Sequence, residues 1–442
     1  MANREIDDGR NRGRRRLIAV VIGVPAVAIV IVVCMVVAWV LRTTGGVERR
    51  LEEIRAKGEP VTLAELERWY PPVPDEENAA LPLEKAFETL HLPRDPNAPV
   101  PLFNNVDGYP KWPVRGQPLP KEVRAAIDTM IDENAECLAH IAEAAQFERC
   151  RFANSPLDDS ESERDHVDAL RALGGLLVLQ TLARADSGDI DGALASVGVG
   201  LALSEFLRGE ALPISQFVRM AMAFNALRAL QHALSCGPAS KEVLESLAMR
   251  LGTCLDDAVL SKVLIGARCE FVADMSARIG HGPFALFTAM DTTAGVDALG
   301  EMIVAASRPP LERHALFQDI RARRFPEELS LVAAVTQMQT SVELYLYTRA
   351  DEVQDKHFVL IQIASVVLRI EIARVMGTAV PSAVEALVPQ YIHAIPIDPF
   401  DGKPMKYRRN DRGYVVYSIG ADRMDGGGRD PEELPTKQSS TS

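Results

Sequence analysis

The stretch ARADSGDIDGALASVGVGLALS, residues Ala183–Ser204, decides the fold class, because it describes two helices joined by a tight turn. Gly188 and Asp189 supply the turn, since both residue types favour such backbone conformations. Small residues such as Ala193 and Gly198 allow two helices to approach each other closely. The stretch therefore predicts an antiparallel pair of packed helices.

Amphipathic and apolar segments on both sides extend this helical pattern. The chain has 442 residues, of which 47% are hydrophobic and only 6% aromatic, a balance that favours helices over an aromatic-rich sandwich of sheets. Thr62 and Glu65 stand at capping-box spacing and predict a short helix behind them. We expect longer helices at about 121–149, 164–186, 190–208, 214–236, 241–250, 256–279 and 327–348, and a looser stretch over 280–310.

The pattern changes from His357 onward. One more apolar helix over 357–377 is expected, followed by a segment rich in proline and glycine. Residues 405–409 and 414–419 then read as two strands around a turn at 410–413. The sequence thus predicts a mainly α protein with a small C-terminal α+β module that contains a β-hairpin.

This C-terminal module resembles the periplasmic part of the major pseudopilin of type II secretion systems over about 70 residues. The matching positions are Pro396, Asp398, Pro399, Phe400, Gly402, Pro404, Tyr407, Tyr417, Ser418, Gly420, Ala421, Asp422, Gly426 and Gly427. The stretch 183–204 also resembles a single tetratricopeptide-type helical hairpin. The two resemblances imply a solenoid-like or bundle-like helical domain followed by a pseudopilin-like cap.

In the pseudopilin family the terminal loop holds a calcium ion, and the resemblance assigns that role to Asp422. Asp425 and Asp430 are nearby oxygen donors, and backbone carbonyls or water would complete the shell of six to eight oxygens that calcium requires. The expectation is a weak structural calcium site. The alternative is a loop in which Asp422 binds local amides and Gly426 to Gly428 supply positive φ angles.

Residues 17–41, LIAVVIGVPAVAIVIVVCMVVAWVL, form an uncharged run of 25 residues. At about 1.5 Å per residue, a helix of that length crosses the hydrocarbon core of a bilayer. Arginines crowd its N-terminal side, which predicts a cytoplasmic N-terminus and an extracytoplasmic bulk. A retained anchor in the inner (cytoplasmic) membrane fits better than a cleaved signal peptide, whose apolar core is shorter, or a lipoprotein signal at Cys34, which Val33 precedes.

These features divide the chain into six parts. We expect a cytoplasmic basic segment (1–16), a transmembrane helix (17–41), a stalk with irregular helices and loops (42–120), an α-helical domain (121–350), the pseudopilin-like module (357–428) and a disordered tail (429–442).

The net charge of −13 argues against a nucleic-acid surface. Beyond residue 16 the chain carries 42 basic and 58 acidic residues, so the exported part is more acidic than the whole. This disfavours docking on anionic lipid by net charge alone and is compatible with a solvated surface, a divalent cation or a basic partner.

Five cysteines lie beyond the membrane run: Cys137, Cys150, Cys236, Cys254 and Cys269. An odd number leaves at least one thiol free or paired with another molecule. Buried thiols are expected, with one disulfide among Cys236, Cys254 and Cys269 as the alternative.

Catalytic motifs for zinc proteases, phosphate-binding loops, dinucleotide sites and serine hydrolases are absent from the sequence. The densest group of titratable residues spans 161–168, where helix capping explains it. Glu270 and Asp274 stand at i, i+4 and could face a cleft together. The sequence therefore predicts a membrane-anchored scaffold, or a protein that binds a protein or peptide, in a bacterial cell envelope, with a connection to secretion. The alternative is an envelope hydrolase whose carboxylates converge in a helical cleft.

Overall fold

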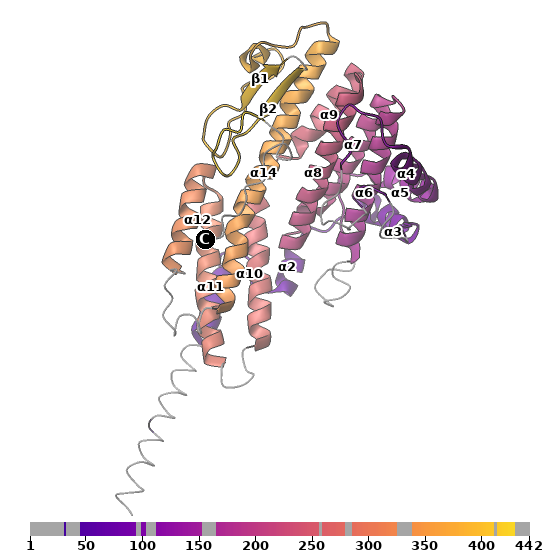
Figure 1. The fold of residues 1–442 in the computed structure, drawn as a ribbon. Helices are drawn as coiled ribbons and strands as arrows, with labels where there is room; N and C mark the ends of the chain where they lie inside the picture. The colour runs from indigo at the N-terminus through magenta and orange to yellow at the C-terminus, as the bar shows by residue number, and fades with distance from the viewer. Residues whose placement is uncertain are drawn as a thin grey trace, which may run out of the picture.

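The computed structural model describes residues 31, 45–93, 99–102, 112–152, 165–255, 259–278, 285–324, 338–410 and 413–428. Within these ranges the protein is mainly helical and carries one two-stranded antiparallel sheet, which confirms the predicted fold class at this level (Figure 1). The predicted segments 1–16 and 429–442 lie outside the described residues. The predicted transmembrane segment also lies outside them, apart from Ile31.

One group of helices, drawn from indigo to pink on the right of Figure 1, forms the larger part of the molecule. Its members are η1 (Asp75–Glu77), α3 (Ala80–Glu88), α4 (Lys121–Glu133), α5 (Ala135–Ala144), α6 (Asp165–Asp186), α7 (Ile190–Glu205), η3 (Phe206–Gly209), α8 (Pro213–Cys236) and α9 (Lys241–Thr253). Helix α2 (Leu63–Trp69) packs instead on α10 (Val259–Arg278). Thr62 caps α2 by accepting a hydrogen bond from the Glu65 amide, as predicted.

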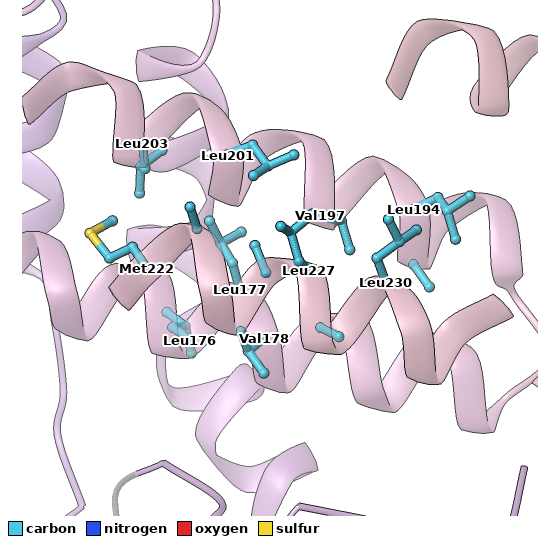
Figure 2. Close-up of a cluster of buried hydrophobic side chains, with 14 of the residues drawn as sticks. Leu176, Leu177, Val178, Leu194, Val197, Leu201, Leu203, Met222, Leu227 and Leu230 are labelled. Carbon is cyan, nitrogen blue, oxygen red and sulfur yellow. The ribbon is translucent and has the colours of Figure 1, made fainter. Parts of the chain in front are cut away.

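Helices α6, α7 and α8 pack on one another and carry the centre of the largest hydrophobic cluster. Figure 2 shows leucine, valine and methionine side chains of the three helices meeting in one layer. Gly188 turns the chain between α6 and α7 with φ of 82°, and Asp189 caps α7 by accepting from the Gly192 amide. The predicted helical pair is confirmed.

Residues Ile190–Gly209 are long and apolar enough to cross a membrane, but 67% of their most apolar window is buried in the protein. Because α7 packs between α6, α8 and α9, burial in the helical core accounts for its apolar composition.

The predicted single helix over 121–149 is wrong, because Asn134 divides it into α4 and α5. The fully buried Asn134 side chain accepts from the His91 amide at 2.7 Å and donates to the His91 carbonyl at 2.9 Å. A side chain that bonds the backbone of a distant segment competes with helix continuation at its own position.

A second group of helices contains α10 (Val259–Arg278), α11 (Ala285–Ala306) and α12 (Pro310–Arg324), at the lower left of Figure 1. Helix α11 contradicts the loose stretch that we expected over 280–310. Gly280, Gly282 and Pro283, the residue types that suggested a loose stretch, precede α11 and lie outside the described residues. Within α11, Val296, Leu299 and Met302 are buried at helical spacing.

The predicted stalk is also partly wrong, because the helical segment 45–55 packs into this second group. Val47, Leu51 and Ile54 follow each other at i, i+4 and i+7 and are buried in the same cluster as α10 and α11. Nearby, Gly266 lets α10 approach another segment closely: a Cβ there would lie 2.1 Å from the Ala211 carbonyl oxygen.

Helix α14 (Met338–Val375) joins the two groups and the C-terminal module. It packs against α8, α9, α10, α11, α12 and β2. No proline or glycine interrupts residues 338–375, so the two helices predicted in this region are one, and the predicted domain limit at 350–357 lies inside it.

The C-terminal module packs on the end of α14 and contains η4 (Val384–Leu387), β1 (Lys406–Asn410) and β2 (Gly413–Tyr417). The strands pair with Lys406 opposite Tyr417 and Asn410 opposite Gly413, which confirms the predicted hairpin. Asp398 is buried and ties the preceding loop to the end of the hairpin. Its carboxylate accepts hydrogen bonds from the amides of Phe400 at 3.0 Å and Ile419 at 2.9 Å.

Candidate functional site

A groove of about 550 Å³ lies between the helical segment 45–55, the residues that follow it, α10, α11 and α12. Its size is within the range of small-molecule pockets. The apolar part of the lining is Ile54, Val296, Ile303, Val304, Leu316 and Ile320, and the charged part is Arg50, Glu53, Lys57, Glu59, Arg268, Asp297, Glu301, Arg308, Glu312, Arg323 and Arg324.

Every carboxylate of this groove is paired with an arginine. Arg50 contacts Glu53 at 2.8 Å and Asp297 at 2.6 Å. Two arginines on α12 contact Glu301, and the remaining pairs are Glu59 with Arg268 at 2.8 Å and Glu312 with Arg308 at 3.8 Å. The contacts of Asp297 with Arg50, of Glu59 with Arg268 and of Glu301 with α12 join different walls of the groove.

Glu301 shows how the arginines of the groove shift the pKa of a carboxylate. Burial alone would raise its pKa, but hydrogen bonds from Arg324 and Arg323 outweigh burial and lower the pKa below the ordinary value. A general acid or base needs a pKa near the working pH, and Glu301 is shifted away from it. The groove lining contains no histidine. This arrangement suits binding better than catalysis.

A second cluster, the buried quartet, consists of Arg313 and His314 on α12 and Asp351 and Asp355 on α14. His314 Nδ1 lies 2.8 Å from Asp351 Oδ2, and Nε2 lies 2.9 Å from Asp355 Oδ2. The Arg313 guanidinium lies 3.5 Å from Asp351 Oδ1 and contacts Asp355 as well. Both aspartates are almost fully buried, so two cations and two anions balance inside the protein.

One histidine and two aspartates could in principle hold a metal ion. The charge state argues against it here. The Asp351 carboxylate, followed by that of Asp355, raises the pKa of His314 to about 9, so both ring nitrogens carry protons at neutral pH and cannot coordinate. Arg313 also occupies the other oxygen of each carboxylate. The quartet therefore acts as a buried ionic clamp between α12 and α14.

A third charged cluster lies where η3, α8 and α14 meet. Arg219 is 1% exposed and binds Glu205 Oε1 through Nε at 3.1 Å and Nη2 at 3.0 Å. Burial, with the positive charges of Arg219 and Arg208 beside it, lowers the pKa of His357 to about 3. His357 is therefore neutral, and this cluster too is structural.

The predicted calcium ligands are only partly covered by the described residues. Asp422 and Asp425 are exposed; Asp422 Oδ1 accepts from the Met424 amide at 3.0 Å and Asp425 Oδ1 from the Gly427 amide at 2.9 Å. Gly427 and Gly428 have positive φ, and Lys406 contacts Asp425 at 3.3 Å. Asp430 lies outside the described residues. These contacts correspond to the alternative of an Asx-turn loop, and the calcium site stays a prediction.

The other titratable residues that the sequence singled out do not converge. His166 pairs with Glu210 at 2.9 Å, and Asp168 contacts Arg171 at 3.3 Å on the same helix. Residues 161 and 163 lie outside the described part of the chain. Glu270 and Asp274 are half-buried on α10 and do not line the groove.

The five cysteines beyond the membrane run are free thiols, so the disulfide alternative is wrong. Cys254 and Cys269 belong to different hydrophobic clusters, and Cys236 is exposed at the end of α8. Their separate positions explain why no pair forms.

Comparison with known proteins found no match among family models, curated proteins or solved structures.

Sequence reasoning missed both the groove and the quartet. The quartet has a weak signal, because Asp351 and Asp355 stand at i, i+4 and Arg313 and His314 are adjacent. The groove has none, because its lining residues come from separate segments that the sequence does not place side by side.

Proposed function

We propose that this protein is a single-pass, membrane-anchored binding protein or scaffold of the bacterial cell envelope. Residues 17–41 would anchor it in the cytoplasmic membrane with the N-terminus inside, and the helical body would hold a protein or peptide partner outside. A connection with secretion rests on the likeness of residues 357–428 to the pseudopilin module.

The observation that favours binding is the groove, in which each carboxylate is neutralised by arginine and no histidine is present. A hydrolase of the kind that uses two carboxylates needs one of them protonated and the other free to act on substrate or water. The described residues of the groove do not provide such a pair, so the hydrolase alternative has less support.

Two experiments test this proposal. A reporter that works only after export, fused after Ser442, should be active. A reporter that works only in the cytoplasm, fused at the same place, should be inactive, and its activity would refute the orientation. Crosslinking in intact envelopes, followed by purification of the full chain, should recover a reproducible partner. Recovery of the same background proteins with an unrelated single-pass control would refute the scaffold role.

A further inference from the structure

The inner end of the groove contains a buried cation with an unused donor. Arg268 is 2% exposed and lines the groove. Its Nη2 contacts Glu59 Oε2 at 2.8 Å and donates to the Pro60 carbonyl at 3.1 Å. Its Nε is buried without a hydrogen-bond partner among the described residues. Leaving such a donor unpaired costs about 1–3 kcal/mol, and the described residues provide no acceptor for it, which favours an acceptor supplied by a ligand.

A second cation belongs to the same end of the groove. Lys57 lines the groove, is exposed and forms no ion pair within the described ranges. Lys57 stands two residues before Glu59, the ion-pair partner of Arg268, so Lys57 and Arg268 lie in the same part of the groove although they are far apart in the sequence. A ligand with an acidic group would meet both of them.

The rest of the groove suits a hydrocarbon chain. Ile54, Ile303, Leu316 and Ile320 line it, and Val304 is 66% exposed on α11. The walls are helices, whose backbone groups are already bonded internally. An extended peptide would therefore find no backbone donors or acceptors to pair with, as it does at a sheet edge.

We propose that this groove binds a long-chain amphiphile with an anionic head group, a carboxylate or a phosphate. Arg268 and Lys57 hold the head group, and the hydrocarbon chain lies along the apolar wall. The ligand is either a free fatty acid or a membrane phospholipid, which share this chemistry. The proposal rests on the binding role of the groove given above.

Gly300 offers a way to close the groove. It lies on α11 in the groove lining, and a Cβ at this position would meet nothing within 4 Å. Gly252 on α9 has the same open surroundings but lies outside the groove. Gly300→Leu should therefore block the groove, whereas Gly252→Leu makes the same change of residue on a helix elsewhere. The matched pair for charge is Lys57→Glu and Lys121→Glu, since Lys121 is exposed on α4 and is not part of the groove.

The experiment uses the full chain in nanodiscs of zwitterionic lipid and a photoreactive C16 fatty acid as probe. We expect crosslinks on peptides that contain residues 50–59, 296–304 and 308–324. Excess palmitate should compete, and hexadecanol, which lacks the acidic group, should not. Gly300→Leu and Lys57→Glu should reduce labelling by about tenfold or more, which corresponds to about 1.4 kcal/mol, whereas the two control variants should label like wild type.

A second arm identifies the source of the lipid. If anionic phosphatidylglycerol in the nanodisc suppresses fatty-acid labelling in wild type, the groove takes phospholipid, and if only free palmitate competes, it takes fatty acid. Either result supports the proposal. Labelling that is unchanged by Gly300→Leu, or competition by hexadecanol equal to that of palmitate, would overturn it. If the lipid proposal failed in this way, recovery of a reproducible partner by crosslinking in intact envelopes would still support the scaffold role.

Discussion

Replacing His314 by glutamine tests whether the quartet stabilises the protein through a protonated imidazole. The two aspartates raise the pKa of His314 in the folded state to about 9, against an ordinary value of 6.5. Because the folded state binds the proton more tightly, the stabilisation is complete below pH 6.5 and is lost as the pH rises through 9.

The size of the effect follows from the same shift. A difference of about 2.5 pKa units corresponds to at most about 3 kcal/mol. Water reaches the His314 side chain, which is 17% exposed, and screening reduces that value. Above pH 9 a neutral His314 leaves one negative charge of the quartet unbalanced, since only Arg313 then faces the two aspartates.

The assay is urea unfolding of the full chain in non-ionic detergent at several pH values between 6 and 9.5. Wild type should exceed His314→Gln in free energy of unfolding at pH 6, and the gap should shrink by up to about 3 kcal/mol towards pH 9.5. His140→Gln is the control, because His140 is half-buried on α5 and lies 3.7 Å from the exposed Glu143, outside the quartet. A difference in unfolding free energy between wild type and His314→Gln that stays constant with pH would refute the reasoning. So would an NMR titration that gives labelled His314 a pKa near 6.5.

Three further predictions concern other buried groups. Asp398→Ala should lower the free energy of unfolding by about 2–4 kcal/mol, because two backbone amides lose their acceptor, and should make the C-terminal module sensitive to protease. Asp401→Ala is the control: it removes a hydrogen bond that is exposed, and it should leave digestion unchanged. The neutral His357, with its pKa lowered to about 3, should make wild type lose stability as the pH falls from 6.5 towards 3, and His357→Leu should show a smaller loss in the same unfolding assay. Alkylation mapped by mass spectrometry should label the exposed Cys236 in the native protein. Cys137 is buried, and burial raises its pKa to about 11, so it should be labelled only after unfolding; labelling of Cys137 in the native protein would contradict its placement.

Local patterns in the sequence were sufficient for most of the helices and for the hairpin. The pair around Gly188, the cap at Thr62 and the strands on either side of 410–413 depend on residues within one or two turns of each other. The interactions that favour these features are short-range, so they can be predicted without knowledge of the rest of the chain.

Where the sequence prediction failed, distant contacts were responsible. Asn134 ends α4 because it bonds the backbone at His91, 43 positions earlier in the chain. The segment 45–55 is part of the core because α10 and α11 cover its apolar face, a partner that the segment itself does not reveal. Burial and side-chain bonds to remote backbone override local propensity, and a single sequence does not show which remote segment will be the neighbour.

The sequence by itself determined the helical class, the C-terminal hairpin, the acidic character of the chain and the apolar run at 17–41. The tertiary structure alone decided the sites. The quartet joins residues 38 and 42 positions apart on α12 and α14, and the groove combines Lys57 with residues of α10, α11 and α12. Charge pairing and cavity shape depend on distances between side chains, and these distances are set only when the helices pack.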